Sequence, residues 1–216
     1  MVREVEKAEA RLQNIQAVTP VLTALRTISL GSWQMSMNRR RGLDRYADRI
    51  LGLLPLLLPD LPKDSPSSKR WLPFVRGSDE ASSSSGSGLS VILLIIGSER
   101  GLCGQYNNIL IDRLDTYLAN SEKKACDVRL TAMGRRLIRE LTRRDYEIAD
   151  TWPRPVASLP DLDLARELVQ AWVKSFETYE VDAVEVLYNA YAGAGDYEPQ
   201  VFELIPPALP LDFEQD

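Results

Sequence analysis

The residues best placed to do chemistry lie in a glycine-rich stretch near the middle of the chain. Gly97, Gly101 and Gly104 follow an apolar run, and Cys103 lies among them. Glycine turns after a first strand often bind phosphate, and a thiol in such a turn is a candidate nucleophile. The spacing matches neither the G-x-G-x-x-G fingerprint nor a P-loop. We therefore interpret the stretch as a tight strand-to-helix turn, with a small nucleotide-binding α/β protein as an alternative.

The chain of 216 residues contains no histidine. Ser-His-Asp and Cys-His nucleophile systems and His-ligated metal sites are therefore excluded. Cys103 has no histidine to activate it, and we interpret it as a small buried side chain. We expect no catalytic residue, no cofactor and no metal. Because only two cysteines occur, we expect a reducing compartment rather than a disulfide scaffold.

Strand and helix signals alternate over residues 90–216. The apolar run 91–96 is typical of a buried parallel strand. The pattern predicts further strands at 126–133, 146–152, 181–192 and 200–207, and helices at 107–119, 135–144 and 162–179. The segment GAGDYEP between the last two strands predicts a hairpin. Together they predict a layered α/β domain with a mostly parallel sheet.

The first part of the chain has the pattern of one long amphipathic helix. Pro20 interrupts it, and we favour a kink there over a new helix with Thr19 as its N-cap. The helical pattern ends at a group of three prolines, Pro55, Pro59 and Pro62. Because one amphipathic helix cannot bury its apolar seam alone, we expect a partner to cover it. The seam, spaced as in a coiled coil, comprises Val5, Ala8, Leu12, Ile15, Leu22, Leu25 and Ile28.

Composition divides the chain into three parts. We expect a shaft-like helix at 1–59, a Pro/Ser/Gly-rich linker at 60–89 and an α/β domain at 90–216. Residues 1–76 carry a net charge of +6 and residues 77–216 a net charge of −11. The basic part predicts contact with an acidic partner, for which Arg39, Arg40 and Arg41 are the candidates. Few aromatic residues accompany these arginines, so we expect no nucleic acid.

Several stretches resemble the gamma subunit of F-type ATP synthases. The segment IIGSERGLCGQYNNIL is similar to that family's S-D-R-G-L-C-G-G-F-N stretch, and residues 3–29 look like its opening helix. Residues 131–148 and 181–206 are similar to its G-x-x-G…F-x-x-R-G-Y and V-D-x-V-x-x-V-Y-N-x-F segments. The motif falls on Ser98, Glu99, Arg100, Gly101, Leu102, Cys103 and Gly104.

This resemblance implies a central-stalk rotor that couples proton flow to ATP synthesis and has no catalytic site of its own. It implies an antiparallel coiled coil inside the alpha/beta hexamer and a Rossmann-like domain at its foot. The partners it implies are the alpha and beta ATPase subunits, an epsilon-type subunit and the membrane c-ring. The charged opening of the chain indicates neither a signal nor a transit peptide. We therefore expect a peripheral protein on the cytoplasmic face of a bacterial inner membrane.

The sequence also departs from the family pattern. The family continues into a long C-terminal helix, whereas this sequence ends in PPALPLDFEQD. We therefore interpret the chain as a divergent member that lacks this helix. Three alternatives follow: a shortened working rotor, a paralogue that receives a separate partner helix, and an assembly or regulatory relative that transmits no torque.

Overall fold

The computed structural model describes residues 2–57, 88–120, 126–152, 162–193 and 196–206. The chain divides into two compact units, Met1–Leu56 and Leu57–Asp216. The predicted linker at 60–89 lies outside the described residues except for its last two positions. In the described part of the chain, no helix is both long and apolar enough to cross a membrane.

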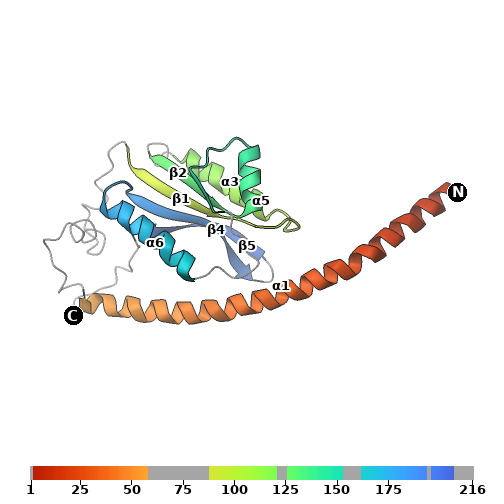
Figure 1. The fold of residues 1–216 in the computed structure, drawn as a ribbon, viewed down its shortest axis with the longest axis horizontal. Helices are drawn as coiled ribbons and strands as arrows, with labels where there is room; N and C mark the ends of the chain where they lie inside the picture. Colours follow the sequence, from red (N-terminus) through yellow and green to blue (C-terminus); the bar gives the residue numbers. More distant parts are fainter. Residues whose placement is uncertain (1, 58–87, 121–125, 153–161, 194–195, 207–216) are drawn as a thin grey trace. The chain divides into compact units, whose positions relative to one another are not determined.

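The first unit is a single helix, α1 (Val2–Leu57), of 56 residues. At 1.5 Å per residue it is about 84 Å long. It continues two residues past Pro55, so the prediction that Pro55 helps to end it is wrong. Figure 1 shows α1 as one continuous ribbon whose gentle curvature is spread along its length.

Pro20 lies inside α1 and does not begin a new helix. The hydroxyl of Thr19 donates to the Ile15 carbonyl at 2.8 Å, so it is not an N-cap acceptor. Thr23 and Thr27 make the same bond to the carbonyls four residues earlier, at 3.0 and 3.1 Å. Such bonds favour gradual bending of a helix. In place of the kink predicted at Pro20, α1 curves gradually along its length (Figure 1).

The second unit is a five-stranded sheet with the strand order β3-β2-β1-β4-β5. Its strands are β1 (Ser90–Ile96), β2 (Asp127–Met133), β3 (Asp150–Trp152), β4 (Ala183–Gly193) and β5 (Asp196–Ile205). Strands β1 to β4 pair in parallel, and β5 pairs antiparallel with β4. This confirms the predicted α/β fold with a mostly parallel sheet.

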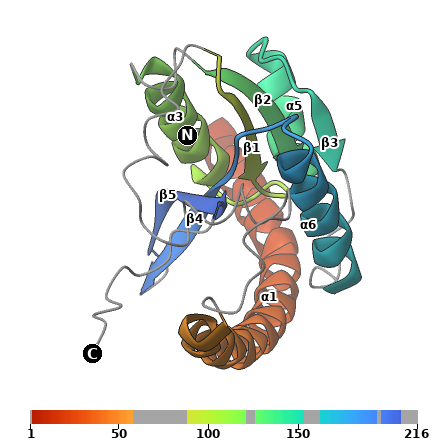
Figure 2. The same ribbon diagram turned by 90° about the vertical axis from the view of Figure 1, so that its left-hand side faces the viewer.

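Helices cover both faces of this sheet (Figure 1). On one face, α3 (Tyr106–Ala119) and α5 (Arg135–Arg143) pack against Leu93 and Ile95 of β1. On the other, α6 (Leu162–Glu177) packs against Leu94. Figure 2 turns the molecule and shows α3 and α6 on opposite sides of β1. Both faces of β1 are thus buried, which explains why its sequence is continuously apolar.

Two predicted strand boundaries are wrong. The strand predicted at 146–152 is only three residues long, because Asp145 adopts a positive φ of 59° and the Tyr146 amide bonds back to the Leu141 carbonyl. The connection predicted as GAGDYEP is shorter, because β5 already begins at Asp196. Tyr197 pairs with Tyr191 across the hairpin, so the predicted turn residues belong to the ladder.

Candidate functional site

The glycine-rich turn runs from the carboxyl end of β1 into α3, and Asn107 fixes its start. The Asn107 side chain, 7% exposed, accepts the Ser98 amide N–H at 3.0 Å and donates to the Ser98 hydroxyl at 2.8 Å. Both polar groups of the amide are therefore used within the turn. The first turn of α3 is thereby tied to the residue that follows Gly97.

The same turn caps a second helix. The Ser98 carbonyl accepts the backbone N–H groups of Arg136 and Leu137 at 3.1 and 3.4 Å. The Glu99 carboxylate accepts the Arg135 amide at 2.9 Å and forms an ion pair with the Arg135 guanidinium. Because these amides are the unsatisfied donors of the α5 N-terminus, the turn provides the cap that α5 lacks in its own sequence.

Close packing explains why glycine occupies position 97. A Cβ there would lie 2.7 Å from Cδ2 of Leu137 and 2.9 Å from Oδ1 of Asn107. Gly134, with φ of 107°, leaves no room for a side chain either, because its Cβ would lie 2.7 Å from the Gly97 carbonyl oxygen. The turn and the start of α5 therefore touch through backbone atoms.

The tip of the turn is exposed. Leu102 is 90% exposed and adopts a left-handed φ of 64°, and Gly104 follows with φ of 58°. Arg100 and Gly101 are also exposed. Cys103 is half-buried rather than fully buried, and its Sγ lies 3.3 Å from the Ser98 hydroxyl. A Leu in the left-handed region costs energy, so the surrounding hydrogen bonds hold a strained apolar tip.

A side chain from β4 completes the link between the turn and the sheet. The Asn189 amide donates to the Tyr106 carbonyl at 2.9 Å. The Tyr106 ring packs at 5.0 Å, centroid to centroid, on Tyr197 of β5. Burial is the main cause of the raised pKa of Tyr106. The start of α3 is therefore held from both sides, by Asn107 and by Asn189.

A polar cavity of about 250 Å³ lies beside the turn. Its lining comprises Gly101, Leu102, Cys103, Gly104, Asn107, Asn108, Arg136, Glu140 and Arg143. Among the described residues, no three Cys, Asp or Glu side chains gather closely enough to hold a metal ion. The backbone amides of Arg135, Arg136 and Leu137 at the start of α5 are already used by Ser98 and Glu99, so this helix start is not open to a phosphate. The arrangement thus favours a structural and contact role for the turn.

The predicted seam lies along α1, and its described side chains are exposed. The exposed fraction is 37% for Leu25, 52% for Leu22 and between 56 and 64% for Val5, Leu12, Ile15 and Ile28. The side chain of Ala8 lies outside the described residues. Such a row of half-exposed aliphatic side chains is available to pack against another helix.

The three consecutive arginines of α1 point in different directions, because successive helical residues are about 100° apart. Arg40 pairs with Asp44 at 3.6 Å, with both side chains 63% exposed. Arg39 and Arg41 are exposed as well. They therefore do not form one basic surface.

Sequence reasoning missed the residues that hold the turn in place. Asn107 and Asn189 belong to an expected helix and an expected strand, and only the tertiary structure brings them to the turn. It also missed the arginines of α5. The sequence did contain a pattern that indicates them. The spacing of Arg136, Arg139 and Arg143 places all three on one face of a helix.

Comparison with known proteins identifies the family. A family model described as ATP synthase matches residues 3–216. The ATP synthase gamma chain of Nostoc punctiforme is 24% identical over 91% of this chain and 58% of the relative, and that of Arthrospira platensis is 25% identical over 94% and 60%. The gamma chain of Syntrophobacter fumaroxidans is 30% identical over 57% of this chain and 42% of the relative.

A solved structure also aligns with this chain. The rotor of the Euglena gracilis mitochondrial ATP synthase covers 82% of this chain and 62% of its own, with 14% identity and a TM-score of 0.45. The chain spans about half the length of the curated relatives that it matches. Because the family model covers nearly the whole sequence, this chain belongs to the ATP synthase gamma-chain family.

Proposed function

We propose that this chain is a gamma-type central-stalk (rotor) subunit of an F-type proton-translocating ATP synthase. It couples ion flow to ATP synthesis and contributes no catalytic site. The observation that carries the proposal is α1, a continuous helix of 56 residues with an exposed apolar seam. A helix of this kind suits the shaft of a rotor, and family membership supports the same role.

The seam implies a partner, because its side chains are only partly buried within this chain. Each Leu, Ile or Val that a partner covers fully contributes about 1.5–3 kcal/mol of hydrophobic free energy. The partner is a second helix in a coiled coil, within a ring of alpha and beta subunits. The chain also meets an epsilon-type subunit and the c-ring, as a peripheral protein on the cytoplasmic face of a bacterial inner membrane.

The α/β domain suits the foot of such a shaft. Its turn is bound to α3 and α5 through backbone and amide hydrogen bonds, and Asn189 of β4 binds the first residue of α3. Because this surface is bonded to several elements of a closely packed domain, we expect it to keep its shape when a neighbouring subunit exerts torque on it. The exposed tip at Leu102 then meets a neighbouring subunit without rearranging the domain.

Affinity purification of the tagged full chain from its native cell tests the proposal. We expect alpha- and beta-type ATPase subunits to copurify with it. Leu12→Asp together with Leu22→Asp places charges on the seam and should abolish that recovery. Ala10→Asp together with Ala17→Asp is the matched control, because these exposed residues lie more than about 100° around α1 from Leu12 and Leu22.

Three results would count against the rotor. Failure of the wild-type chain to recover alpha and beta subunits under stringent washing would contradict it. Recovery without any change in ATP turnover when the chain is removed would indicate an assembly or regulatory protein instead. Thermal stabilisation of the purified chain by a nucleotide would favour the nucleotide-binding alternative.

A further inference from the structure

The two faces of the sheet are covered unequally. Helices α3 and α5 pack on one face, whereas α6 is the only helix in the described part of the domain that packs on the other. The buried side chains of α6 cluster with buried side chains of β1, β4 and β5, and β2 and β3 contribute only partly buried ones. A cavity of about 430 Å³ lies between α6 and these two strands. It is the part of this face that a single helix leaves uncovered.

The walls of this cavity, which we call the α6 cavity, are mainly apolar. Trp152 of β3 and Trp172 of α6 line it with two indole rings, and Ile92 and Leu168 contribute aliphatic side chains. Trp172 is 9% exposed, so the core holds its ring in place. Cavities of about 300–1,000 Å³ with apolar walls and a few polar groups are typical of small-molecule sites. The α6 cavity therefore has the size and the walls for an aromatic ligand.

Three side chains with oxygen atoms line the same cavity: Thr131, Asp150 and Glu167. Thr131 and Asp150 are partners in the parallel register of β2 and β3, so their side chains leave the same face of the sheet about 5 Å apart. Thr131 is 6% exposed, and within the described residues its hydroxyl makes no hydrogen bond. A buried hydroxyl without a partner is unfavourable, so a polar group of a ligand would stabilise it.

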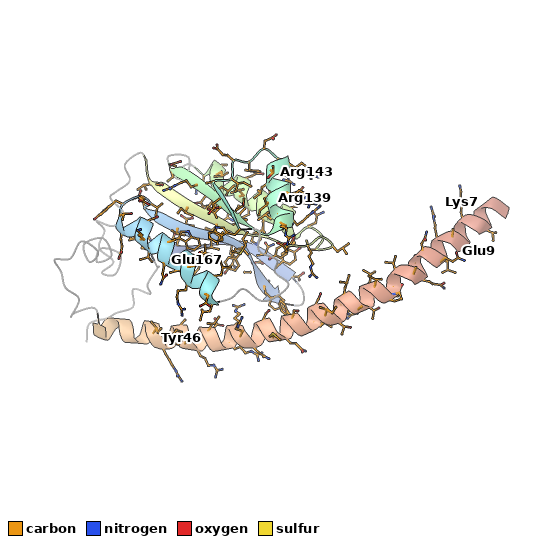
Figure 3. The ribbon with its side chains drawn as sticks, in the orientation of Figure 1. Lys7, Glu9, Tyr46, Arg139, Arg143 and Glu167 are labelled. Atoms are coloured by element: carbon orange, nitrogen blue, oxygen red, sulfur yellow. The ribbon has the colours of Figure 1, made fainter. Side chains whose placement is uncertain are left out.

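Glu167 brings a second carboxylate towards Asp150. Helix α6 ends close to the start of β4, so its first half, which contains Glu167, lies towards the carboxyl ends of the parallel strands. Figure 3 labels Glu167 on α6. Asp150 is exposed and uses one carboxylate oxygen to accept the Thr151 amide at 2.8 Å. Two carboxylates and one hydroxyl therefore provide acceptors at this end of the α6 cavity.

Arg129 also lines the α6 cavity, but its charge is held at the opposite end. One of its terminal nitrogens donates to the Ser90 hydroxyl at 2.8 Å and to the Glu180 carbonyl at 2.7 Å. Its Nε is buried and has no hydrogen-bond partner within the described structure, so a ligand in the cavity does not reach this atom. Thr131 lies two residues, about 7 Å, further along β2. The two ends of the cavity therefore differ in charge, and the end beside Asp150 is negative.

We propose that the α6 cavity binds a small organic cation with a flat apolar body, in which a primary ammonium is joined to an aromatic ring. An ammonium has three N–H donors, which match the oxygens of Thr131, Asp150 and Glu167. The ring packs against the indoles of Trp152 and Trp172, since aromatic pairs are favourable beyond their buried area. The net charge of residues 77–216, −11, attracts a cation to the domain. The proposal goes beyond the rotor role, because neither α1 nor the glycine turn takes part in it.

The test is an NMR titration of the purified full chain with isotope-labelled indole nitrogens. The probe is phenethylamine, and phenethyl alcohol and phenylacetate are the neutral and anionic probes of similar size. We expect phenethylamine to shift the indole N–H signals of Trp152 and Trp172 and to leave that of Trp33 in α1 unchanged. It should bind about tenfold more tightly than the alcohol, because charge-assisted hydrogen bonds are about twice as strong as neutral ones. Phenylacetate should bind most weakly, because the carboxylates repel it.

One pair of variants tests the charge. Asp150→Asn should weaken the binding of phenethylamine about tenfold, because it removes a charged acceptor. The new side chain keeps an oxygen that can accept the Thr151 amide, so the fold is preserved. Asp112→Asn is the matched control, because this exposed residue of α3 lies on the opposite face of the sheet. It should leave Kd unchanged.

A second pair of variants tests the volume. Ala171→Phe adds a large side chain at an exposed position of α6 that lines the cavity, and it should abolish binding. Ala165→Phe makes the same change at an exposed position of α6 about 120° away around the helix, and binding should persist. Because both positions are exposed, we expect both variants to fold.

Four results would overturn the proposal, and none of them bears on the rotor experiment, which concerns the seam of α1. Unchanged signals of Trp152 and Trp172 at about 10 mM phenethylamine would show that the cavity takes no such ligand. Equal affinity for the amine and the alcohol would show that apolar burial alone drives binding. Tighter binding of phenylacetate would assign the cavity to anions held by Arg129. Equal weakening by Asp112→Asn would show attraction by the net charge of the domain.

Discussion

The two units of this protein obtain their structure in different ways. In the α/β domain, Leu93, Ile95 and Leu110 are 0% exposed and belong to one core. In α1, the apolar side chains of the seam are 37 to 64% exposed. The domain is therefore stabilised by its own tertiary contacts, whereas α1 has backbone hydrogen bonds and an uncovered face. We therefore expect the same substitution to lower the free energy of unfolding more in the α/β domain than in α1.

The largest expected effect comes from a matched pair of Leu→Ala substitutions. Leu110→Ala removes a fully buried side chain of α3 and should lower the free energy of unfolding by about 2–5 kcal/mol. Leu22→Ala, at a position 52% exposed in α1, should change it by less than about 0.5 kcal/mol in the isolated chain. Urea unfolding of both variants measures the difference. Equal losses would contradict the contrast between the two units.

A smaller effect is expected from a glycine pair in the turn. Gly97→Ala places a Cβ against Leu137 and Asn107 and should cost about 1–3 kcal/mol. Gly101→Ala meets no atom within 4 Å and should change stability by less than about 0.5 kcal/mol. Thermal unfolding followed by circular dichroism distinguishes them. If Gly101→Ala proved the more damaging, the packing explanation for position 97 would be wrong.

Removal of the cap on α5 is expected to cost about 1 kcal/mol. Glu99→Ala leaves the Arg135 amide without its acceptor at the helix N-terminus. We expect faster amide hydrogen exchange in the first turn of α5 and unchanged exchange in α1. Glu147→Ala serves as the control, because this exposed carboxylate lies beyond the end of α5. If both substitutions changed amide exchange equally, the cause would be the loss of a negative charge rather than the loss of the cap.

The smallest expected effect appears at alkaline pH. Burial and the hydrogen bond from its hydroxyl to Asp115 raise the pKa of Tyr146 to about 12. Because the folded state holds this proton more tightly than the unfolded state, its contribution to stability is complete below pH 10. That contribution is lost as pH rises towards about 12. Tyr146→Phe should therefore show a shallower loss of stability over this range in pH-dependent urea unfolding. An identical slope for both proteins would contradict the assigned cause.

Much of the fold could be predicted because local patterns and burial agree. The apolar run at β1 and the helical spacing of α3, α5 and α6 each reflect the face that the tertiary structure buries. The boundaries of β3 and β5 could not be predicted. They depend on the positive φ at Asp145 and on pairing across the β4–β5 hairpin, which are decided by contacts between elements.

The sequence by itself determined the long helix, the alternation of strands and helices, the glycine turn and the family resemblance. The first three follow from composition and spacing within a few neighbouring residues, whereas the resemblance rests on the motifs that the chain shares with the family. Only the tertiary structure decided how the turn is held in place. Ser98, Asn107, Arg136 and Asn189 come from four separate stretches, and their hydrogen bonds form only when those stretches pack together. The same packing buries Leu137 and Leu141 and leaves the arginines of α5 facing outward.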